Sequence, residues 1–173
     1  PLPAGSPINP FPGAPIDPSG SNPMLDDIGP GSYSQRIDNP DLTAEGDFKI
    51  VPMRIENSFK ILASDTDPRG LEVYGLEGKV GGTCVDVWVD RSEHIIRYIE
   101  IKTLSGKSVL APFNLSVIKK NSIFINSIMS SQFEDVPGLK NANTISLLEE
   151  EKIMGYYGAG TLMAFPRRRE SFF

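Results

Sequence analysis

The stretch Thr83-Cys-Val-Asp-Val-Trp-Val-Asp90 decides the fold class, because its side chains alternate in character along the chain. Successive side chains of a β-strand point to opposite faces. The stretch therefore predicts one strand with two faces, Thr83, Val85, Val87 and Val89 on one and Cys84, Asp86, Trp88 and Asp90 on the other. A polar turn and a second alternating run, Ile95–Leu104, follow directly. The two runs together predict a β-hairpin.

Short runs rich in valine and isoleucine continue this pattern on both sides of the hairpin. They are separated by turn-forming residues, with four glycines between positions 75 and 82. The predicted strands lie within Phe48–Arg54, Leu71–Tyr74, Ser108–Phe113, Leu115–Lys119 and Ser122–Ile128. Strands at this spacing predict a mainly β chain, built as a small antiparallel barrel or sandwich.

One helix is predicted near residues 146–157. Ser146-Leu-Leu-Glu149 fits a capping box, in which the serine and the glutamate each bond the other's backbone amide. Glu149–Glu151 then supplies negative charge to the first turn, where the helix dipole favours it. We expect Gly158 or Gly160 to end the helix, and Thr161–Phe165 to form a last strand.

The N-terminal segment has a different composition, since residues 1–40 hold 10 of the 15 prolines among 173 residues. Proline lacks a backbone N–H and fixes φ, so neither helix nor sheet is expected there. Large apolar residues recur between the prolines, which leaves two readings: a disordered linker, or an extended strap along a partner. The predicted organisation is thus a proline-rich segment at 1–40, a globular domain at 41–166 and a basic tail at 167–173.

Composition excludes several classes of function. The single cysteine, Cys84, excludes an internal disulfide framework and a multi-cysteine zinc site, and the single histidine, His94, excludes a histidine-rich metal centre. We expect Cys84 to pack as a small apolar group. The net charge of −5 disfavours nonspecific binding to nucleic acid. No run of residues reaches the ~18 to 20 apolar positions that span a bilayer.

Two groups of carboxylates are candidates for proton chemistry. Repulsion among neighbouring acids raises some pKa values toward neutrality, and such groups can relay protons near pH 7. The groups are Asp41, Glu45 and Asp47, and, around the hairpin, Asp86, Asp90, Glu93 and Glu100. The competing reading is a solvated acidic surface. A hydrolase that uses Asp90 and Glu93 is a further, weaker alternative.

Several motifs, in the same order, closely resemble the photosynthetic reaction-centre H subunit of purple bacteria. They are Gly29–Tyr33, Lys49–Met53, Asp67–Leu71, Asp86–His94 with Arg97–Glu100, Leu147–Ile153 and Gly155–Gly160. The resemblance implies a PRC-type barrel with a C-terminal helix, preceded by the extended proline-rich segment. It also implies an N-terminal transmembrane helix that this sequence does not contain. The chain is therefore expected to be the C-terminal part of a longer polypeptide, or a naturally anchorless form.

The resemblance further implies a non-catalytic subunit at the cytoplasmic face of the bacterial photosynthetic inner membrane. Such a subunit caps the L and M subunits, stabilises the secondary quinone site and helps conduct protons to it. A cytochrome subunit, a light-harvesting antenna and surface lipid are further expected partners. Bacteriochlorophyll, bacteriopheophytin, quinones and non-haem iron are expected on the other subunits, and no cofactor on this chain.

The matching positions carry implied roles. Glu93 corresponds to a buried acid near the quinone route, with Asp90 and Arg97 as its neighbours. Glu45 and Asp47 stand where several relatives place two proton-accepting surface histidines, so proton entry there is in question. The alternative function is a free-standing PRC-barrel binding module, similar to domains of ribosome-maturation factors.

Overall fold

The computed structural model describes residues 38–61 and 65–163, with side chains described as far as residue 160. From Pro40 onward these residues belong to one compact unit. The predicted strap at 1–40, apart from its last three residues, and the predicted basic tail at 167–173 lie outside the described residues.

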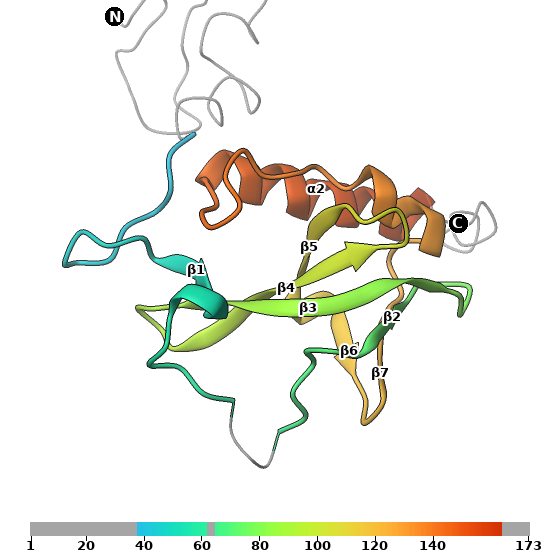
Figure 1. Cartoon of the computed structure of the whole chain (residues 1–173). Coiled ribbons are helices and arrows are strands. Elements are labelled where there is room, and N and C mark those ends of the chain that lie inside the picture. Colours follow the sequence, from blue (N-terminus) through green and yellow to red (C-terminus); the bar gives the residue numbers. More distant parts are fainter. Residues whose placement is uncertain (1–37, 62–64, 164–173) are drawn as a thin grey trace, which may run out of the picture. The chain divides into compact units, whose positions relative to one another are not determined.

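Seven strands form one curled sheet with the order β5-β4-β3-β2-β7-β6, and β1 pairs with β3 outside this path (Figure 1). The strands are β1 (Ile50–Pro52), β2 (Glu72–Tyr74), β3 (Val80–Asp90), β4 (Ile95–Thr103), β5 (Ser108–Pro112), β6 (Ser116–Ile118) and β7 (Ser122–Ile125). The prediction of a mainly β, barrel-like chain is therefore confirmed. β1 ends at Pro52, and a 3-10 turn, Met53–Ile55, follows it directly.

One strand pair differs from the predicted antiparallel arrangement. β2 and β7 run parallel, with Glu72 opposite Ser122 and Tyr74 opposite Phe124. The sheet is consequently mixed. Local patterns could not reveal this pairing, because it joins strands that are separated by four intervening strands along the chain.

The long pair β3–β4 contains two irregularities that change which side chains point inward. Its register passes from Cys84–Ile101 to Asp86–Glu100, which skips Val85, and from Trp88–Tyr98 to Val89–Ile96, which skips Arg97. A bulge redirects the side chains beside it. Val85 is exposed, whereas Asp86, Trp88 and Val89 are all buried. The strict two-face pattern predicted for this strand is thus wrong at Val85.

The core lies between the sheet and the C-terminal helix α2 (Leu147–Met163), which runs beside β5 (Figure 1). Its largest fully buried side chains include Trp88, Tyr98, Phe133, Ile153 and Tyr157. Cys84 is buried among them, as expected, and burial raises the pKa of its thiol to about 12. The cysteine is therefore a packing residue without thiolate reactivity at neutral pH.

Helix α2 begins as predicted and ends later. The Ser146 hydroxyl accepts the Glu149 amide at 3.0 Å, and the Glu149 carboxylate accepts the Ser146 amide at 2.8 Å, which confirms the capping box. The helix then continues through Gly155, Gly158 and Gly160, so the expected end there and the strand expected from residue 161 are wrong. Among the described helices, none is both long and apolar enough to cross a bilayer.

Candidate functional site

Asp90 ends β3 with its side chain fully enclosed. One carboxylate oxygen accepts the backbone amides of Ser92 at 2.8 Å and Glu93 at 3.0 Å. The Asp90 carbonyl accepts the amide of His94, whose φ of 58° closes the turn. An aspartate that accepts amides two and three residues ahead is a common turn former. The turn therefore fixes the Asp90 carboxylate in place.

Two cations reach the other oxygen of Asp90. Arg97 Nη1 lies 3.0 Å from it and Lys49 Nζ lies 3.8 Å away. Arg97 is the residue skipped in the β3–β4 register, and Lys49 directly precedes β1, where Ile50 pairs with Asp90. The bulge and the short strand β1 thus bring both cations to a buried acid. Asp90 and Arg97, which the resemblance implies are neighbours of Glu93, are thus paired with each other.

The ion pairs continue in both directions from Asp90. Lys49 Nζ lies 3.7 Å from Asp41, and Arg97 Nη2 lies 3.5 Å from Glu150. The result is an alternating series, Asp41–Lys49–Asp90–Arg97–Glu150, which we call the charge row. Its Asp41 end has a side chain that is 44% exposed, whereas Asp90 at its centre is 0% exposed. The charge row therefore leads from the surface into the protein.

Glu150 is the least expected member of the charge row. Its carboxylate accepts the Tyr98 hydroxyl at 2.6 Å, and burial raises its pKa despite that hydrogen bond and the nearby Arg97. The sequence reading treated Glu150 only as charge for the helix N-terminus. Helical spacing was the missed signal, because Glu150, Ile153 and Tyr157 share one face and the latter two are fully buried.

Glu93, the strongest sequence candidate, is exposed in this chain. It lies in the 91–94 turn, beside the enclosed Asp90, and its carboxylate makes no hydrogen bond or ion pair within the described part of the chain. The expected burial of Glu93 is therefore not a property of this chain by itself. It would require a second protein over the turn.

Glu45 and Asp47 are also exposed, on a tight turn before β1. The Thr43 amide and hydroxyl hold the backbone of Asp47, and Gly46 adopts a φ of 92°. Lys49 donates its amide to the carbonyl of Asp41 at 2.9 Å, so this turn is attached to the outer end of the charge row. Neither carboxylate is itself joined to the charge row.

A second group, which we call the Arg54 cluster, consists of the buried acids Asp86 and Glu100 and the arginine between them, Arg54. Only the two acids were predicted. Asp86 and Glu100 lie directly opposite each other on β3 and β4, and both are buried. Arg54 Nη1 bridges them at 3.2 and 2.8 Å, and the Trp88 indole donates to Glu100 at 2.8 Å. Because like charges directly opposite repel, the arginine is required. Sequence reasoning missed Arg54, which lies 32 residues before Asp86.

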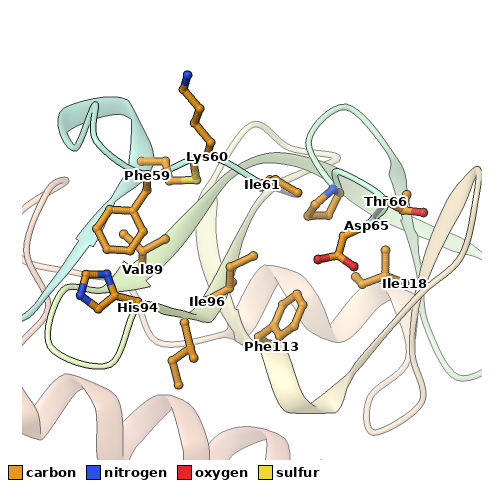
Figure 2. A pocket seen from close by; sticks show the side chains of 13 residues that line it. Phe59, Lys60, Ile61, Asp65, Thr66, Val89, His94, Ile96, Phe113 and Ile118 are labelled. Atoms are coloured by element: carbon orange, nitrogen blue, oxygen red, sulfur yellow. The ribbon is translucent and has the colours of Figure 1, made fainter. Parts of the chain in front are cut away.

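Two pockets adjoin the 91–94 turn. The larger has a volume of about 710 Å³ and is lined mainly by apolar side chains, with Phe59 stacked on His94 at 5.4 Å (Figure 2). The smaller, of about 290 Å³, lies beside Glu150 and Tyr98. Asp90 lines neither pocket and its side chain is fully enclosed, which removes the support for a hydrolase based on Asp90 and Glu93.

Metal-ligating side chains do not gather in this structure. Within the described ranges, no three histidine, cysteine, aspartate or glutamate side chains are placed to hold one metal ion. The buried acids instead meet arginine, lysine, tyrosine and tryptophan. The site is therefore an ion-pair and hydrogen-bond network around Asp90 and the neighbouring Glu93 turn.

Comparison with known families agrees with this architecture. Residues 61–132, which include β2 to β7, match the PRC-barrel domain, so the class of protein is a PRC-barrel protein. Residues 4–55 match the N-terminal region of the photosynthetic reaction-centre H chain. The two matches, in this order, make the chain an H-subunit-like protein of the photosynthetic reaction centre. H chains are reaction-centre subunits and are generally non-catalytic.

Proposed function

We propose that this chain caps the cytoplasmic face of the pigment-binding L and M subunits in a purple bacterial reaction centre. In this role it excludes bulk water from the secondary quinone site and helps conduct protons toward it. The observation that carries the proposal is the charge row, a continuous series of ion pairs from the exposed Asp41 to the half-buried Glu150.

The chemistry of quinone reduction requires a route for protons, and the charge row could form part of it. A doubly reduced quinone takes up two protons, and a buried quinone can receive them only through titratable groups and water. Arginine does not release its proton, so Arg97 would hold its neighbours in place, while the carboxylate of Glu150 would accept and release protons. The raised pKa of Glu150 supports this, since a group closer to neutrality exchanges protons more readily near pH 7.

Glu93 is proposed as the proton-transferring carboxylate nearest the quinone site. Its amide is bonded to the enclosed Asp90, which orients the turn that presents Glu93 to solvent. In the complex, the L and M subunits would cover this turn and bury the carboxylate. The same Glu93 side chain would then be exposed in the isolated chain and buried in the complex.

Glu45 and Asp47 are the proposed entry side. They are exposed acids on the turn that is attached to Asp41, at the outer end of the charge row. Their negative charge would attract protons to this surface and toward the charge row.

The first test is the near-infrared spectrum of the complex that co-purifies with this chain from native membranes in mild detergent. Stoichiometric bacteriochlorophyll bands are expected. A colourless chain, or one that co-purifies with ribosomal protein, would contradict the proposal and favour the free-standing binding module.

The second test is the rate of proton-coupled second electron transfer to the quinone, measured by flash spectroscopy between pH 5 and 9. We expect Glu93→Gln to slow this step about tenfold or more, which corresponds to ~1.4 kcal/mol in the barrier. Glu151→Gln, at an exposed position on α2, is the matched control and should leave the rate unchanged. Equal rates in both variants at every pH would remove Glu93 from the proton route.

A further inference from the structure

The inner end of the charge row opens into the smaller pocket. This pocket, which we call the Glu150 pocket, has a volume of about 290 Å³. Its lining combines the carboxylate of Glu150 and the guanidinium of Arg97, which are paired with each other, with the apolar side chains of Ile95, Phe113 and Met154. All of these residues come from β4, the turn after β5, and α2, so the pocket lies where the sheet meets the helix.

The Glu150 carboxylate is only partly used by its neighbours. Tyr98 and Arg97 both approach the same oxygen, Oε1, at 2.6 and 3.5 Å. The second oxygen, Oε2, accepts no hydrogen bond from the residues that the structure describes, although the side chain is only 13% exposed. A carboxylate oxygen that borders a pocket can accept a hydrogen bond from a group that enters the pocket.

When all of its carboxylates are ionised, the charge row also has one negative charge in excess. It contains three carboxylates, Asp41, Asp90 and Glu150, and two cations, Lys49 and Arg97. Because the charges alternate and an acid stands at each end, one more cation at Glu150 would continue the series. The outer end at Asp41 is exposed to solvent, so the missing positive charge has its largest effect at Glu150.

The rim of the pocket defines what kind of cation fits. Ile95 is 49% exposed and Met154 is 42% exposed, so the half-buried carboxylate of Glu150 has an exposed apolar rim beside it. A lysine or arginine side chain combines a methylene stem with a terminal charge and packs along apolar surface with its charge at a polar group. A hydrated metal ion would leave this apolar rim uncovered.

We propose that the Glu150 pocket receives a lysine or arginine side chain from the reaction-centre core, and that this residue completes the charge row across the interface. The inference rests on the proposed function, since it names the chemistry by which the partner is recognised. The stem would cover Ile95 and Met154, and the cation would bond the free Oε2 of Glu150.

The test is the affinity of the full chain for a reaction-centre core from which this subunit has been removed. Removal of one partner from a desolvated charge pair weakens association by about thirtyfold or more. Glu150→Gln should therefore weaken binding by that factor at low salt. The matched control is Glu151→Gln, which removes the same charge from the next, exposed position of α2 and should change affinity less than about threefold.

A second variant tests the pocket without removal of the acid. Residues 150 and 154 are four apart on α2, the spacing at which a glutamate and a following lysine form an ion pair on a helix. Met154→Lys should therefore fill the pocket from within and weaken binding about as much as Glu150→Gln. Met154→Leu keeps the rim apolar and should bind as the unchanged chain does.

The outcomes separate the two proposals. If the unchanged chain does not bind the core, the proposed function fails. If it binds, and Glu150→Gln binds as tightly as Glu151→Gln, the inference fails while the proposed function stands. Tight binding by Met154→Lys would likewise overturn the inference, because a blocked pocket could not then be part of the interface.

Discussion

The charge row and the Arg54 cluster contain the same residue types, but they connect different parts of the protein. Both pair buried carboxylates with arginine, and both carry one more negative than positive charge. The Arg54 cluster is held by a core tryptophan and by the backbone amides of Arg54 and Val87. Arg54 also bonds Asn143 and the carbonyl of Ala142, just before α2. This cluster joins the sheet to the segment that leads into the helix.

The charge row instead joins a surface turn to a pocket. One end is an exposed aspartate beside the turn that carries Glu45 and Asp47, and the other end is a carboxylate at a pocket. Its centre lies beside the exposed turn of Glu93. A buried ion pair alone is therefore poor evidence of function. What separates the two groups is that the charge row connects surfaces, whereas the Arg54 cluster connects parts of the fold.

The largest expected effect is on stability, in the Arg54 cluster. Arg54→Met would leave two opposed buried carboxylates without their bridge. A fully buried pair costs about 3–5 kcal/mol when one partner is removed, and since Arg54 is partly exposed we expect about 2–3 kcal/mol. Urea denaturation measures this. Arg69→Met, which breaks only the exposed pair with Asp67, should cost under about 1 kcal/mol, and similar losses in both would mean that the cluster is not structural.

A smaller stability effect is expected in the charge row. Asp90→Asn removes the central charge but keeps an oxygen for the amides of Ser92 and Glu93, so we expect a loss of about 1–2 kcal/mol. Asp41→Asn makes the same change at the exposed end and should cost under about 1 kcal/mol. A greater loss at Asp41 than at Asp90 would contradict the order of burial along the charge row. The same denaturation series provides both values.

The smallest effect is a pH dependence with a defined sign. Burial raises the pKa of Glu150 above its ordinary 4.5, so the folded chain keeps a proton that the unfolded chain has lost. The stability of the unchanged chain should therefore fall relative to that of Glu150→Gln as pH rises from about 4.5 through the raised pKa.

Glu134 provides the control of opposite sign. Hydrogen bonds from Ser105 and Thr103 lower its pKa, so its contribution is present above the ordinary pKa and is lost as pH falls through the lowered one. Relative to Glu134→Gln, the unchanged chain should thus gain stability as pH rises. Denaturation curves between pH 3 and 8 compare the two variants, and slopes of the same sign would contradict the assigned burial of Glu150.

Much of the fold follows from local patterns in the sequence. The alternation around Trp88 predicted β3 and β4, and the Ser146–Glu149 pattern predicted the start of α2. The predictions that failed concern features that depend on tertiary contacts. α2 continues past Gly160, where a side chain would collide with Ile128, so close packing and not a helix end explains that glycine. The parallel β2–β7 pair depends on the path of the whole chain.

The site was predicted in part and for identifiable reasons. Asp90 was found among the hairpin acids and Arg97 through the resemblance, and the two side chains are in contact. Lys49, Arg54 and Glu150 were missed, since each comes from another element and only the folded sheet brings it to the hairpin acids. Glu93 was found, but its exposure could not be predicted, because burial there depends on a second protein.

The most direct test of the account compares one variant from each group in the assembled reaction centre. Asp90→Asn interrupts the charge row, and Arg54→Lys changes the Arg54 cluster while it keeps the positive charge. Flash spectroscopy gives the rate of proton-coupled second electron transfer to the quinone. We predict that Asp90→Asn slows this step about tenfold or more and that Arg54→Lys leaves it within about twofold of the unchanged complex. Equal rates in the two variants, or a slower step in Arg54→Lys, would contradict the distinction between the two groups.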